Sequence, residues 1–597
     1  MQVWRDRERV SGMSDTIKLK INGTEVVAPR GATVLEAARL AGVEIPTLCY
    51  MKEINAIGSC RICVVEIKGG RGLAAACVFP AAEGMEVFTN TETVAAARRG
   101  TLELMLSNHR MDCLTCLRSQ NCELQALSKN LGVEAVRYPK DNTEPQLETS
   151  APHLTRDNSK CVLCRRCVAV CKQNQEVAVI GPNDRGFATH IGCAFDRDLA
   201  ESPCVSCGQC IVACPTGALT ERDQTREVWD AIADPKKHVV VGTAPSIRVT
   251  LGECFGMPVG TNAEGKMFAA LRRLGFDRVF DVDVTADLTI MEEANEFIER
   301  VQTKGTLPLI TSCSPGWVSY CERYYPEFID NLSTCKSPQQ MFGAMVKTYY
   351  AQKEGVNPED IFVVTVMPCT AKKYEILHRD QAVKGLPDVD VALTTRELGR
   401  MIERAGLLFR DLPDEKPDPA FGEATGAGVI FGATGGVMEA ALRTAADTLT
   451  GEDLKSVDYQ DVRGLEGVKE AAYDVAGIRV KVAVASGTAN AKRLLESVKS
   501  GEKDYHFIEI MGCPGGCVNG GGQPVQPMPL KNFTDVRAAR SKTIYEMDKG
   551  NPLRKSHDSP LMKKVYKDFL GEPGGKKAHE VLHTHYHKTE KYPGVNV

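Results

Sequence analysis

The chain has 597 residues, a formal net charge of −4, 25% charged residues and 43% hydrophobic residues. This composition indicates a globular protein of several domains and excludes the basic stripe of nucleic-acid-binding proteins. No apolar run reaches the roughly 18 residues of a membrane span. The first residues, MQVWRDRERVSG, are charged and carry no apolar signal segment, which predicts a cytoplasmic protein with a disordered or mis-assigned extension over residues 1–13.

The first group of cysteines follows a predicted hairpin and helix. Residues 16–28 alternate polar and apolar side chains around Asn22-Gly23, and residues 33–42 predict a short helix that ends at a glycine. The spacing C-x10-C-x2-C-x13-C suits a [2Fe–2S] cluster, although zinc also binds four cysteines. The segment resembles the plant-type ferredoxin variant of complex I and hydrogenase subunits, which implies a β-grasp domain over residues 14–92 with ligands Cys49, Cys60, Cys63 and Cys77.

A second group, spaced H-x3-C-x2-C-x5-C, falls in residues 93–135. Three cysteines and a histidine would also suit zinc. Directly after a [2Fe–2S] domain, however, the group resembles the His-ligated [4Fe–4S] module of the same proteins. The expected ligands are His109, Cys113, Cys116 and Cys122.

The third group repeats the run C-x2-C-x2-C-x3-C within residues 136–224, which predicts a two-cluster ferredoxin domain. In such domains the fourth cysteine of each run binds the other cluster. One [4Fe–4S] cluster is therefore expected on Cys161, Cys164, Cys167 and Cys214, and the other on Cys171, Cys204, Cys207 and Cys210. Four clusters before residue 220 predict an electron-transfer chain, whose catalytic end must lie in the rest of the sequence.

From about residue 225 the sequence alternates apolar strands with helical stretches, which predicts α/β architecture with parallel sheets up to residue 540. The expected strands are HVVVGTAP, RVFDVD, LPLITS, IFVVTVMP, GVIFGATG and VKVAVASG. Ligands bind at the carboxyl ends of such strands, and three loops there carry cysteine. These loops are TSCSPGW, VMPCTAKKYE and EIMGCPGGCVNGGGQP.

The three loops resemble the signature segments of [FeFe]-hydrogenases, and the resemblance covers nearly the whole chain. The nearest type is the large catalytic subunit of NAD(P)-linked or electron-bifurcating enzymes, with a two-lobed α/β domain. The resemblance implies an H-cluster, a [4Fe–4S] cubane joined to a two-iron centre with CO, cyanide and azadithiolate. It assigns the cubane to Cys369, Cys513 and Cys517, a cyanide contact to Lys372, and flanking positions to Ala244, Pro245, Ser246, Met367 and Met511.

The segment DLTIMEEANEFIER predicts a helix with Glu293, Glu296 and Arg300 on one face. Taken alone, these residues favour a solvated face with salt bridges. The resemblance implies instead that they form, with Ser333, the family's proton path to the cluster. A buried acidic chain relays protons when burial raises its pKa values.

The stretch TSCSPGW leaves two assignments open for Cys313 and Ser314. Much of the resembled family has two cysteines here, the first a proton relay and the second a cubane ligand. Ungapped spacing to Cys369 makes Cys313 the relay and Ser314 the ligand. The preference of iron for thiolate favours a one-residue shift, with Cys313 as fourth ligand and Ser314 as a hydroxyl relay, and we prefer that assignment.

Residues 541–597 resemble the family's separate small subunit, fused here to the large one. The four histidines of this segment, His579, His583, His585 and His587, suit metal binding, but we expect packing or solvent exposure. The remaining cysteines, Cys193, Cys254, Cys321 and Cys335, are expected to be structural thiols.

The sequence thus predicts reversible oxidation of H2 to protons and electrons. Expected partners are ferredoxin, flavin- and NAD(P)-binding and small [2Fe–2S] subunits, and maturation proteins. Two other functions fit parts of the pattern. A non-catalytic wiring subunit of a complex I-like assembly explains the cluster chain but not the three loops, and a hydrogen sensor would need a signalling segment that is not recognisable here.

Overall fold

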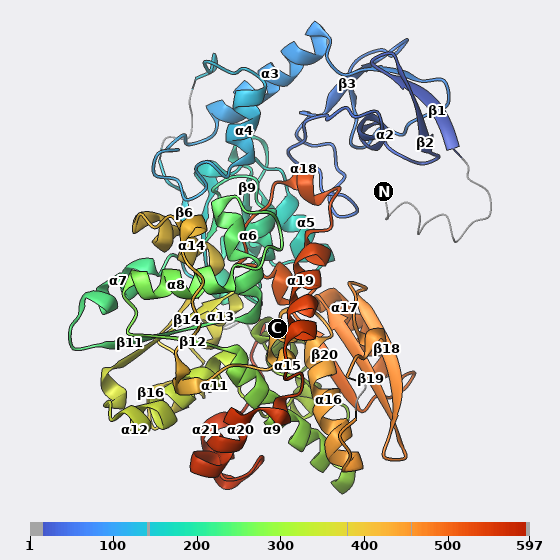
Figure 1. Cartoon of the computed structure of the whole chain (residues 1–597). Helices are drawn as coiled ribbons and strands as arrows, with labels where there is room; N and C mark the ends of the chain where they lie inside the picture. The colour runs from blue at the N-terminus through green and yellow to red at the C-terminus, as the bar shows by residue number, and fades with distance from the viewer. Residues whose placement is uncertain (1–15, 140–143, 379, 455–456, 593–597) are drawn as a thin grey trace.

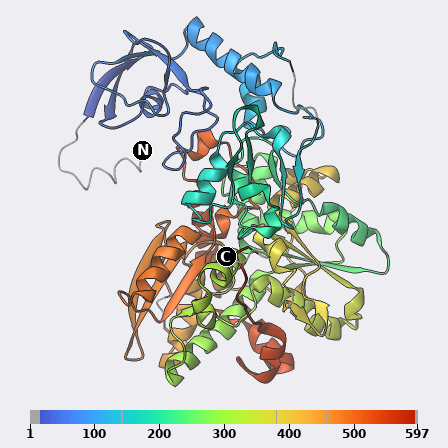
Figure 2. The same ribbon diagram turned by 180° about the vertical axis from the view of Figure 1, so that it is seen from behind.

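The computed structural model describes residues 16–139, 144–378, 380–454 and 457–592, and the predicted extension at residues 1–13 lies outside this part. In Figure 1 the N-terminal modules form one end of the molecule, and the α/β region forms the other. The two-cluster segment lies between them, as the reverse view in Figure 2 also shows.

The N-terminal module is a five-stranded sheet covered by a helix. Strand β1 pairs antiparallel with β2 and parallel with β5. The predicted hairpin is confirmed, because Asn22 and Gly23 adopt φ of 50° and 85° at its turn. The predicted helix is also confirmed, since Thr33 and Glu36 form a capping box. The sheet order is β2(Thr24–Pro29)-β1(Thr16–Ile21)-β5(Glu86–Phe88)-β3(Val64–Ile67)-β4(Ala74–Ala75), with α2(Val34–Leu40).

Two helices, α3 (Glu92–Ser107) and α4 (Glu123–Asn130), lead to the two-cluster segment. There, α5 carries the last two cysteines of the first run, α6 carries Cys210 of the second run and ends at Cys214, and the two helices pack against each other. The elements are β6(Leu147–Glu148), β7(Leu154–Asp157), α5(Arg166–Gln173), β8(Gly181–Asn183), β9(His190–Gly192), α6(Gln209–Ala213), β10(Leu219–Glu221) and α7(Thr225–Ala233).

The α/β region contains two four-stranded sheets. The first is entirely parallel, as predicted, and its central strands are apolar because both faces are buried. Its order is β12(Arg278–Asp281)-β11(His238–Thr243)-β14(Ile361–Met367)-β17(Val391–Thr394). In the second sheet the edge strand β18 is antiparallel, which departs from the prediction. Its order is β13(Leu309–Ile310)-β20(Phe507–Met511)-β19(Ile478–Ser486)-β18(Val468–Val475).

One predicted strand is wrong. Residues 428–435, GVIFGATG, form no strand: they comprise the end of α15 (Gly426–Val429), the 3-10 turn Ile430–Gly432 and the turn that precedes α16. A side chain at Gly428 would lie 2.4 Å from the Asp283 carbonyl oxygen, so this small residue permits close packing against α9. A short buried apolar run does not distinguish a strand from a helix.

The long helix α9 (Asp283–Thr303) packs against α11, α15 and α16. It confirms the helix predicted for DLTIMEEANEFIER. Other elements of the region are α8(Glu264–Leu274), α10(Pro315–Tyr324), α11(Pro338–Met345), α12(Ala351–Glu354), α13(Ala371–Glu375), β15(Ala382–Val383), β16(Leu386–Pro387), α14(Thr395–Arg404), α16(Gly436–Thr450) and α17(Thr488–Lys499).

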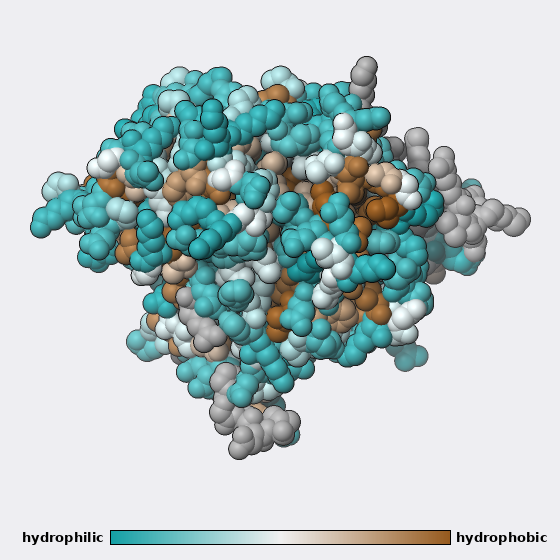
Figure 3. All heavy atoms as spheres, turned by 90° about the horizontal axis from the view of Figure 1, so that it is seen from below, coloured by the Kyte–Doolittle hydropathy of each residue, from teal (hydrophilic) through white to brown (hydrophobic). Residues whose placement is uncertain are grey.

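The C-terminal segment contains α18 (Met528–Lys531), α19 (Val536–Gly550), α20 (Pro560–Val565) and α21 (Lys576–Leu582). Met528 of α18 packs against Met51 of the N-terminal module, whereas α19 packs against α15 of the α/β region. Helix α21 packs against α11. The surface seen from below is mainly hydrophilic, with apolar areas interrupted by polar side chains (Figure 3). Within the described ranges, every helix is too short or too polar to cross a membrane.

Candidate active site and cluster sites

Three cysteine loops from the two lobes face one cavity. They follow the carboxyl ends of β13, β14 and β20, and residues of all three loops line the cavity. The cavity has a volume of about 80 Å³. The residues predicted from the sequence to form the active site that line this cavity are Ala244, Pro245, Cys313, Ser314, Met367, Cys369, Lys372, Met511, Cys513 and Cys517.

Ser246 is the one predicted flanking residue that does not line this cavity. Its fully buried hydroxyl accepts a 3.1 Å hydrogen bond from Gln523 Nε2. Gln523 Nε2 also donates to the Cys517 carbonyl oxygen at 3.0 Å. Ser246 therefore supports the third cysteine loop from behind.

Thiols and glycines together give the cavity the character of a cluster site. Contact with the Cys513 thiol lowers the pKa of Cys369, which shows that these two sulfurs meet. A side chain at Gly516 would lie 2.6 Å from the Thr434 nitrogen, and one at Gly520 would lie 2.2 Å from the Pro368 oxygen. Only glycine therefore lets the third loop close around the cavity, which fits a bulky group held by thiolates.

Cys313 and Ser314 differ in their surroundings. Burial, and then the neighbouring Glu293 carboxylate, raises the pKa of the Cys313 thiol. Ser314 Oγ accepts a 3.0 Å hydrogen bond from the backbone N–H of Gly512, next to Cys513. Cys313 is thus the residue on the side of Glu293, and Ser314 faces the loop of Cys513.

Lys372 is fixed by three neighbours. Its ammonium donates to the Cys313 carbonyl oxygen at 3.2 Å, to Ser337 Oγ at 2.8 Å and to Glu375 Oε2 at 3.0 Å. Neither Ser337 nor Glu375 was predicted to be a site residue. Glu375 was recognisable as the last residue of the loop VMPCTAKKYE, whereas Ser337 comes from a distant part of the chain.

The acidic residues of α9 form a buried chain with Ser333. Glu293 is 1% exposed, and burial and then the Glu296 carboxylate raise its pKa to about 8. The Ser333 hydroxyl interacts with Glu293 and donates to Glu296 Oε2 at 2.8 Å. Arg300 Nη2 donates to Glu296 Oε1 at 2.6 Å. Glu293 is therefore buried and Glu296 and Arg300 are only partly exposed, unlike the solvated face that these residues favour when taken alone.

The fused C-terminal segment is attached to this chain. His583 Nδ1 bonds Thr334 Oγ1 at 2.8 Å, and His583 Nε2 lies 3.1 Å from Glu292 Oε2. The rings of His579 and His583 stack with centroids 4.0 Å apart. His579 and His583 therefore pack against neighbouring side chains, as expected. Cys335 was expected to be a structural thiol. Its Sγ lies 3.9 Å from Glu296 Oε2, and the spacing of cysteines in the sequence does not reveal this proximity.

The four N-terminal thiols lie together. Hydrogen bonds with Cys60 and Cys77 lower the pKa of Cys49, and one with Cys77 lowers the pKa of Cys63. All four side chains are buried. Such a compact set of thiols can hold a metal cluster.

His109, Cys113, Cys116 and Cys122 line one cavity. Burial lowers the pKa of His109, which favours the neutral ring that metals bind. Its buried Nδ1 has no hydrogen-bond partner within the described ranges. A side chain at Gly217 would lie 2.6 Å from Cys116 Sγ, so glycine leaves space beside this set.

In the two-cluster segment the structure brings the cysteines into the two crossed sets. Cys161, Cys164, Cys167 and Cys214 line one small cavity. The pKa of Cys204 is raised by burial and then by Cys171, and that of Cys210 by burial, Cys204 and Cys171. Burial also raises the pKa of Cys207, to which Cys210 and Cys204 add.

The second of these sets is joined to the active-site cavity by backbone packing. Thr370 Oγ1, next to Cys369, donates to the Ser206 carbonyl oxygen at 2.8 Å. Gln209 Nε2 donates to the Asn519 carbonyl oxygen at 2.8 Å. A side chain at Gly521 would lie only 2.2 Å from the Cys207 carbonyl oxygen. The two sites are therefore in direct contact through their loops.

A row of thiol-rich sites that ends at a thiol-lined cavity, beside a buried carboxylate chain, defines a redox enzyme that handles electrons and protons together. Matches to models of known protein families indicate which class of redox enzyme this is. The iron only hydrogenase large subunit, C-terminal domain, matches residues 237–521, and the iron hydrogenase small subunit matches residues 534–589. A 2Fe-2S cluster binding domain matches residues 14–92, the NADH-ubiquinone oxidoreductase-G iron-sulfur binding region matches 98–137, and a 4Fe-4S binding domain matches 200–220.

Similarity to individual proteins leads to the same family as the family models. The NADP-reducing hydrogenase subunit HndD of Solidesulfovibrio fructosivorans is 46% identical over 96% of this chain and 99% of its own. Iron hydrogenase 1 of Clostridium pasteurianum is 43% identical over 95% and 99%. The solved apo [FeFe]-hydrogenase HydA1 from Chlamydomonas reinhardtii is 39% identical, with a TM-score of 0.55 over 62% of this chain and all of that one.

The chain belongs to the iron-only, or [FeFe]-, hydrogenases. It catalyses the oxidation of H2 to protons and electrons, with iron–sulfur groups of the 2Fe-2S and 4Fe-4S types as electron relays. These relationships favour neither a non-catalytic wiring subunit nor a hydrogen sensor.

Proposed function

We propose that four accessory clusters connect the surface to the active site. The [2Fe–2S] cluster would be held by the N-terminal thiols, the second cluster by the His109 set, and two [4Fe–4S] clusters by the crossed sets. The support is that each set of side chains is gathered at one place. The set of Cys171, Cys204, Cys207 and Cys210 is the one in contact with the active-site loops, so it would exchange electrons with the H-cluster directly.

In the active-site cavity, Cys369, Cys513 and Cys517 would hold the cubane, with Cys517 shared with the two-iron centre. When bound, the H-cluster supplies the redox-active iron at which H2 is split or formed. Lys372 presents its ammonium at the wall of the cavity, where it can interact with a cyanide ligand. Met367 and Met511 exclude water from the same space.

For the neighbouring pair we propose that Cys313 relays protons and that Ser314 provides the fourth cubane ligand through its oxygen. This reverses the preference drawn from iron chemistry alone. Cys313 is the residue beside Glu293, whereas Ser314 Oγ faces the backbone N–H before Cys513. Protons would then pass from Cys313 through Glu293, Ser333 and Glu296 to Arg300 near the surface.

The electrons would pass to ferredoxin or to NAD(P)-linked subunits that carry flavin and a small [2Fe–2S] cluster. The printed name of the HndD relative, an NADP-reducing hydrogenase subunit, supports such partners. Electron bifurcation, supply of the two-iron centre by maturation proteins, and a cytoplasmic location are part of the same proposal.

The contact between the Cys204–Cys210 loop and the active-site loops carries this proposal, because it joins the electron chain to the catalytic cavity. To test the proposal, the protein is matured under anaerobic conditions with a synthetic two-iron group. Its H2 evolution from reduced methyl viologen is then measured. Activity that disappears when Cys517 is replaced by alanine, with all accessory clusters still present, would support the ligand assignment. An unmodified protein that carries all of its clusters but shows no H2 evolution would contradict the proposed function.

A further inference from the structure

The N-terminal thiols and the first ferredoxin thiols meet at one buried junction. Asn55, which is 4% exposed, donates through Nδ2 to the Cys49 carbonyl oxygen at 2.8 Å and to the Cys164 carbonyl oxygen at 3.1 Å. Cys49, Cys60 and Cys164 also belong to one apolar core. The loops proposed to hold the [2Fe–2S] cluster and the first [4Fe–4S] cluster are therefore in direct contact.

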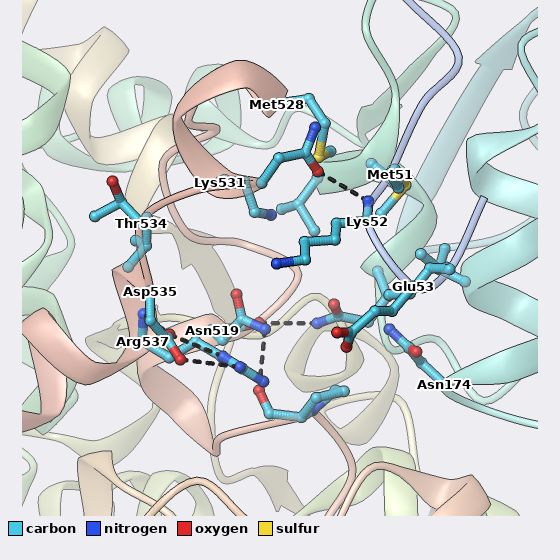
Figure 4. A pocket seen from close by; sticks show the side chains of 18 of the residues that line it. Met51, Lys52, Glu53, Asn174, Asn519, Met528, Lys531, Thr534, Asp535 and Arg537 are labelled. Atoms are coloured by element: carbon cyan, nitrogen blue, oxygen red, sulfur yellow. Dashed lines mark hydrogen bonds and ion pairs between the residues drawn. The ribbon is translucent and has the colours of Figure 1, made fainter. Parts of the chain in front are cut away.

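Apolar side chains pack beside this junction. Met51 of the N-terminal module, Val170 of α5 and Met528 belong to one buried cluster, at the wall of a cavity of about 370 Å³. Figure 4 shows Met51 and Met528 near each other at the edge of that cavity. Helix α5 is therefore packed against the N-terminal module as well as against α6.

A buried guanidinium lies at this junction. Arg166 begins α5 between Cys164 and Cys167, and its side chain is fully buried. Burial is the largest influence on the pKa of this guanidinium and lowers it, but Glu123 and other neighbours raise the pKa above its ordinary value. These neighbours include the thiols of Cys164 and Cys49. Both thiol sets thus lie within electrostatic reach of one permanent positive charge.

Arg166 donates to its acidic partner through one nitrogen only. Its Nη1 lies 2.8 Å and 2.9 Å from the two carboxylate oxygens of Glu123. The buried Nε and Nη2 atoms meet no hydrogen-bond partner among the residues that the structure describes. Because a buried N–H group without an acceptor is costly, this arrangement calls for an acceptor that these residues do not supply.

We propose that Arg166 tunes the reduction potentials of two clusters, the [2Fe–2S] cluster of the N-terminal thiols and the [4Fe–4S] cluster of the set that includes Cys164. This inference rests on the cluster assignments of the proposed function. Positive charge near a cluster and hydrogen bonds to its sulfurs both favour reduction. Since the Glu123 carboxylate contacts only Nη1, the N–H groups of Nε and Nη2 remain available to cluster sulfur. Arg166 would thus raise the potentials of two electron relays at once.

The experiment is a redox titration of the anaerobic full-length protein with its accessory clusters loaded, followed by electron paramagnetic resonance. The [2Fe–2S] signal is recorded at temperatures at which [4Fe–4S] signals are broadened. At the wild-type midpoint potential, Arg166→Met should lower the ratio of reduced to oxidised [2Fe–2S] cluster at least about 10-fold, equivalent to about 59 mV for one electron. Arg166→Lys should cause a smaller shift, because the charge is kept but the fork of N–H groups is lost.

Two further variants make the test specific. Glu123→Gln removes the negative partner of Arg166, so it should raise the ratio of reduced to oxidised cluster. Arg226→Met removes one positive charge at a side chain that is 93% exposed, and it should leave the ratio unchanged. If Arg166→Met fails to load a cluster, the opposite shift in Glu123→Gln still decides the question.

Equal ratios in the wild type, Arg166→Met and Glu123→Gln would overturn the proposal. A shift in Arg226→Met as large as that in Arg166→Met would also overturn it, because the effect would then follow from net charge alone. A wild-type protein with full iron content but no [2Fe–2S] signal would contradict the cluster assignments on which the proposal rests. None of these readouts depends on H2 turnover.

Discussion

The Ser333 hydroxyl connects two carboxylates of α9, donating to Glu296 Oε2 at 2.8 Å while also interacting with the fully buried Glu293. Removing this hydroxyl should interrupt the proposed proton route without disturbing the thiols. We expect Ser333→Ala to lower H2 evolution by about 10²- to 10⁴-fold, the usual contribution of a positioned proton-transfer group. Ser333→Thr, which keeps the hydroxyl, should restore most of the activity. Equal activity of the alanine variant and the wild type would exclude this route.

Glu293 should titrate far above an ordinary carboxyl group. Its pKa rises from 4.5 to about 8, so between these values the folded protein holds a proton that the unfolded chain releases. Its contribution to stability therefore falls as the pH rises through this window, by up to about 1.4 kcal/mol per pH unit. Infrared spectroscopy should show a protonated carboxyl band that disappears around pH 8. The band should be absent from Glu293→Gln and unchanged in Glu299→Gln, where the residue is exposed. A band that has already been lost by pH 6 would contradict the assignment.

Cys313 and Ser314 can be separated by paired substitutions. If Cys313 is the relay, Cys313→Ala should keep the cubane, seen by electron paramagnetic resonance, and lose at least about 100-fold in turnover. Ser314→Cys should keep activity and strengthen cluster binding, since cubane iron prefers thiolate. Loss of the cubane in Cys313→Ala would instead support Cys313 as the fourth ligand.

His109 should be required for one cluster only. Nδ1 of the buried ring lies beside three thiols and meets no hydrogen-bond partner among the residues that the structure describes, so His109→Ala should remove that cluster and lower the iron content accordingly. The remaining accessory clusters should give unchanged spectra. His190→Ala, in a part-exposed hairpin position of the ferredoxin segment, is the matched control. Unchanged iron content in His109→Ala would show that His109 is not a ligand.

The contact between Gly521 and the Cys207 loop should tolerate no side chain. A Cβ there would meet a backbone oxygen at 2.2 Å, which cannot move without displacing the loop. Gly521→Ala should cost at least about 1–3 kcal/mol and slow electron transfer between the two sites. Gly550→Ala, where an added Cβ would approach no packing neighbour of the described chain within 4 Å, should have little effect. For both variants, stability is measured by thermal inactivation and electron transfer by stopped-flow reduction. Equal stability and equal electron-transfer rates in the two variants would contradict close packing at Gly521.

Local patterns predicted much of this molecule. The hairpin at Asn22-Gly23, the helix after Thr33 and α9 follow from short-range signals, and cysteine spacing anticipated which thiols gather. The segment around Gly428 was mispredicted because its apolar run is buried by tertiary packing that periodicity does not report. The neighbours of Lys372 and the position of Cys335 were missed for a related reason. Both depend on residues that are distant in sequence and brought together only by the fold.

The bond between His583 and Thr334 has a consequence for how the enzyme responds to dilution. The segment that carries His583 corresponds to the small-subunit family model, yet here it is part of the same chain as the helix it stabilises. Its association with the proposed proton route is intramolecular and is governed by an effective concentration that does not change with the amount of protein. The Ser333–Thr334 loop should therefore stay in place in nanomolar assays, at concentrations where a two-chain arrangement of the same contacts would begin to separate.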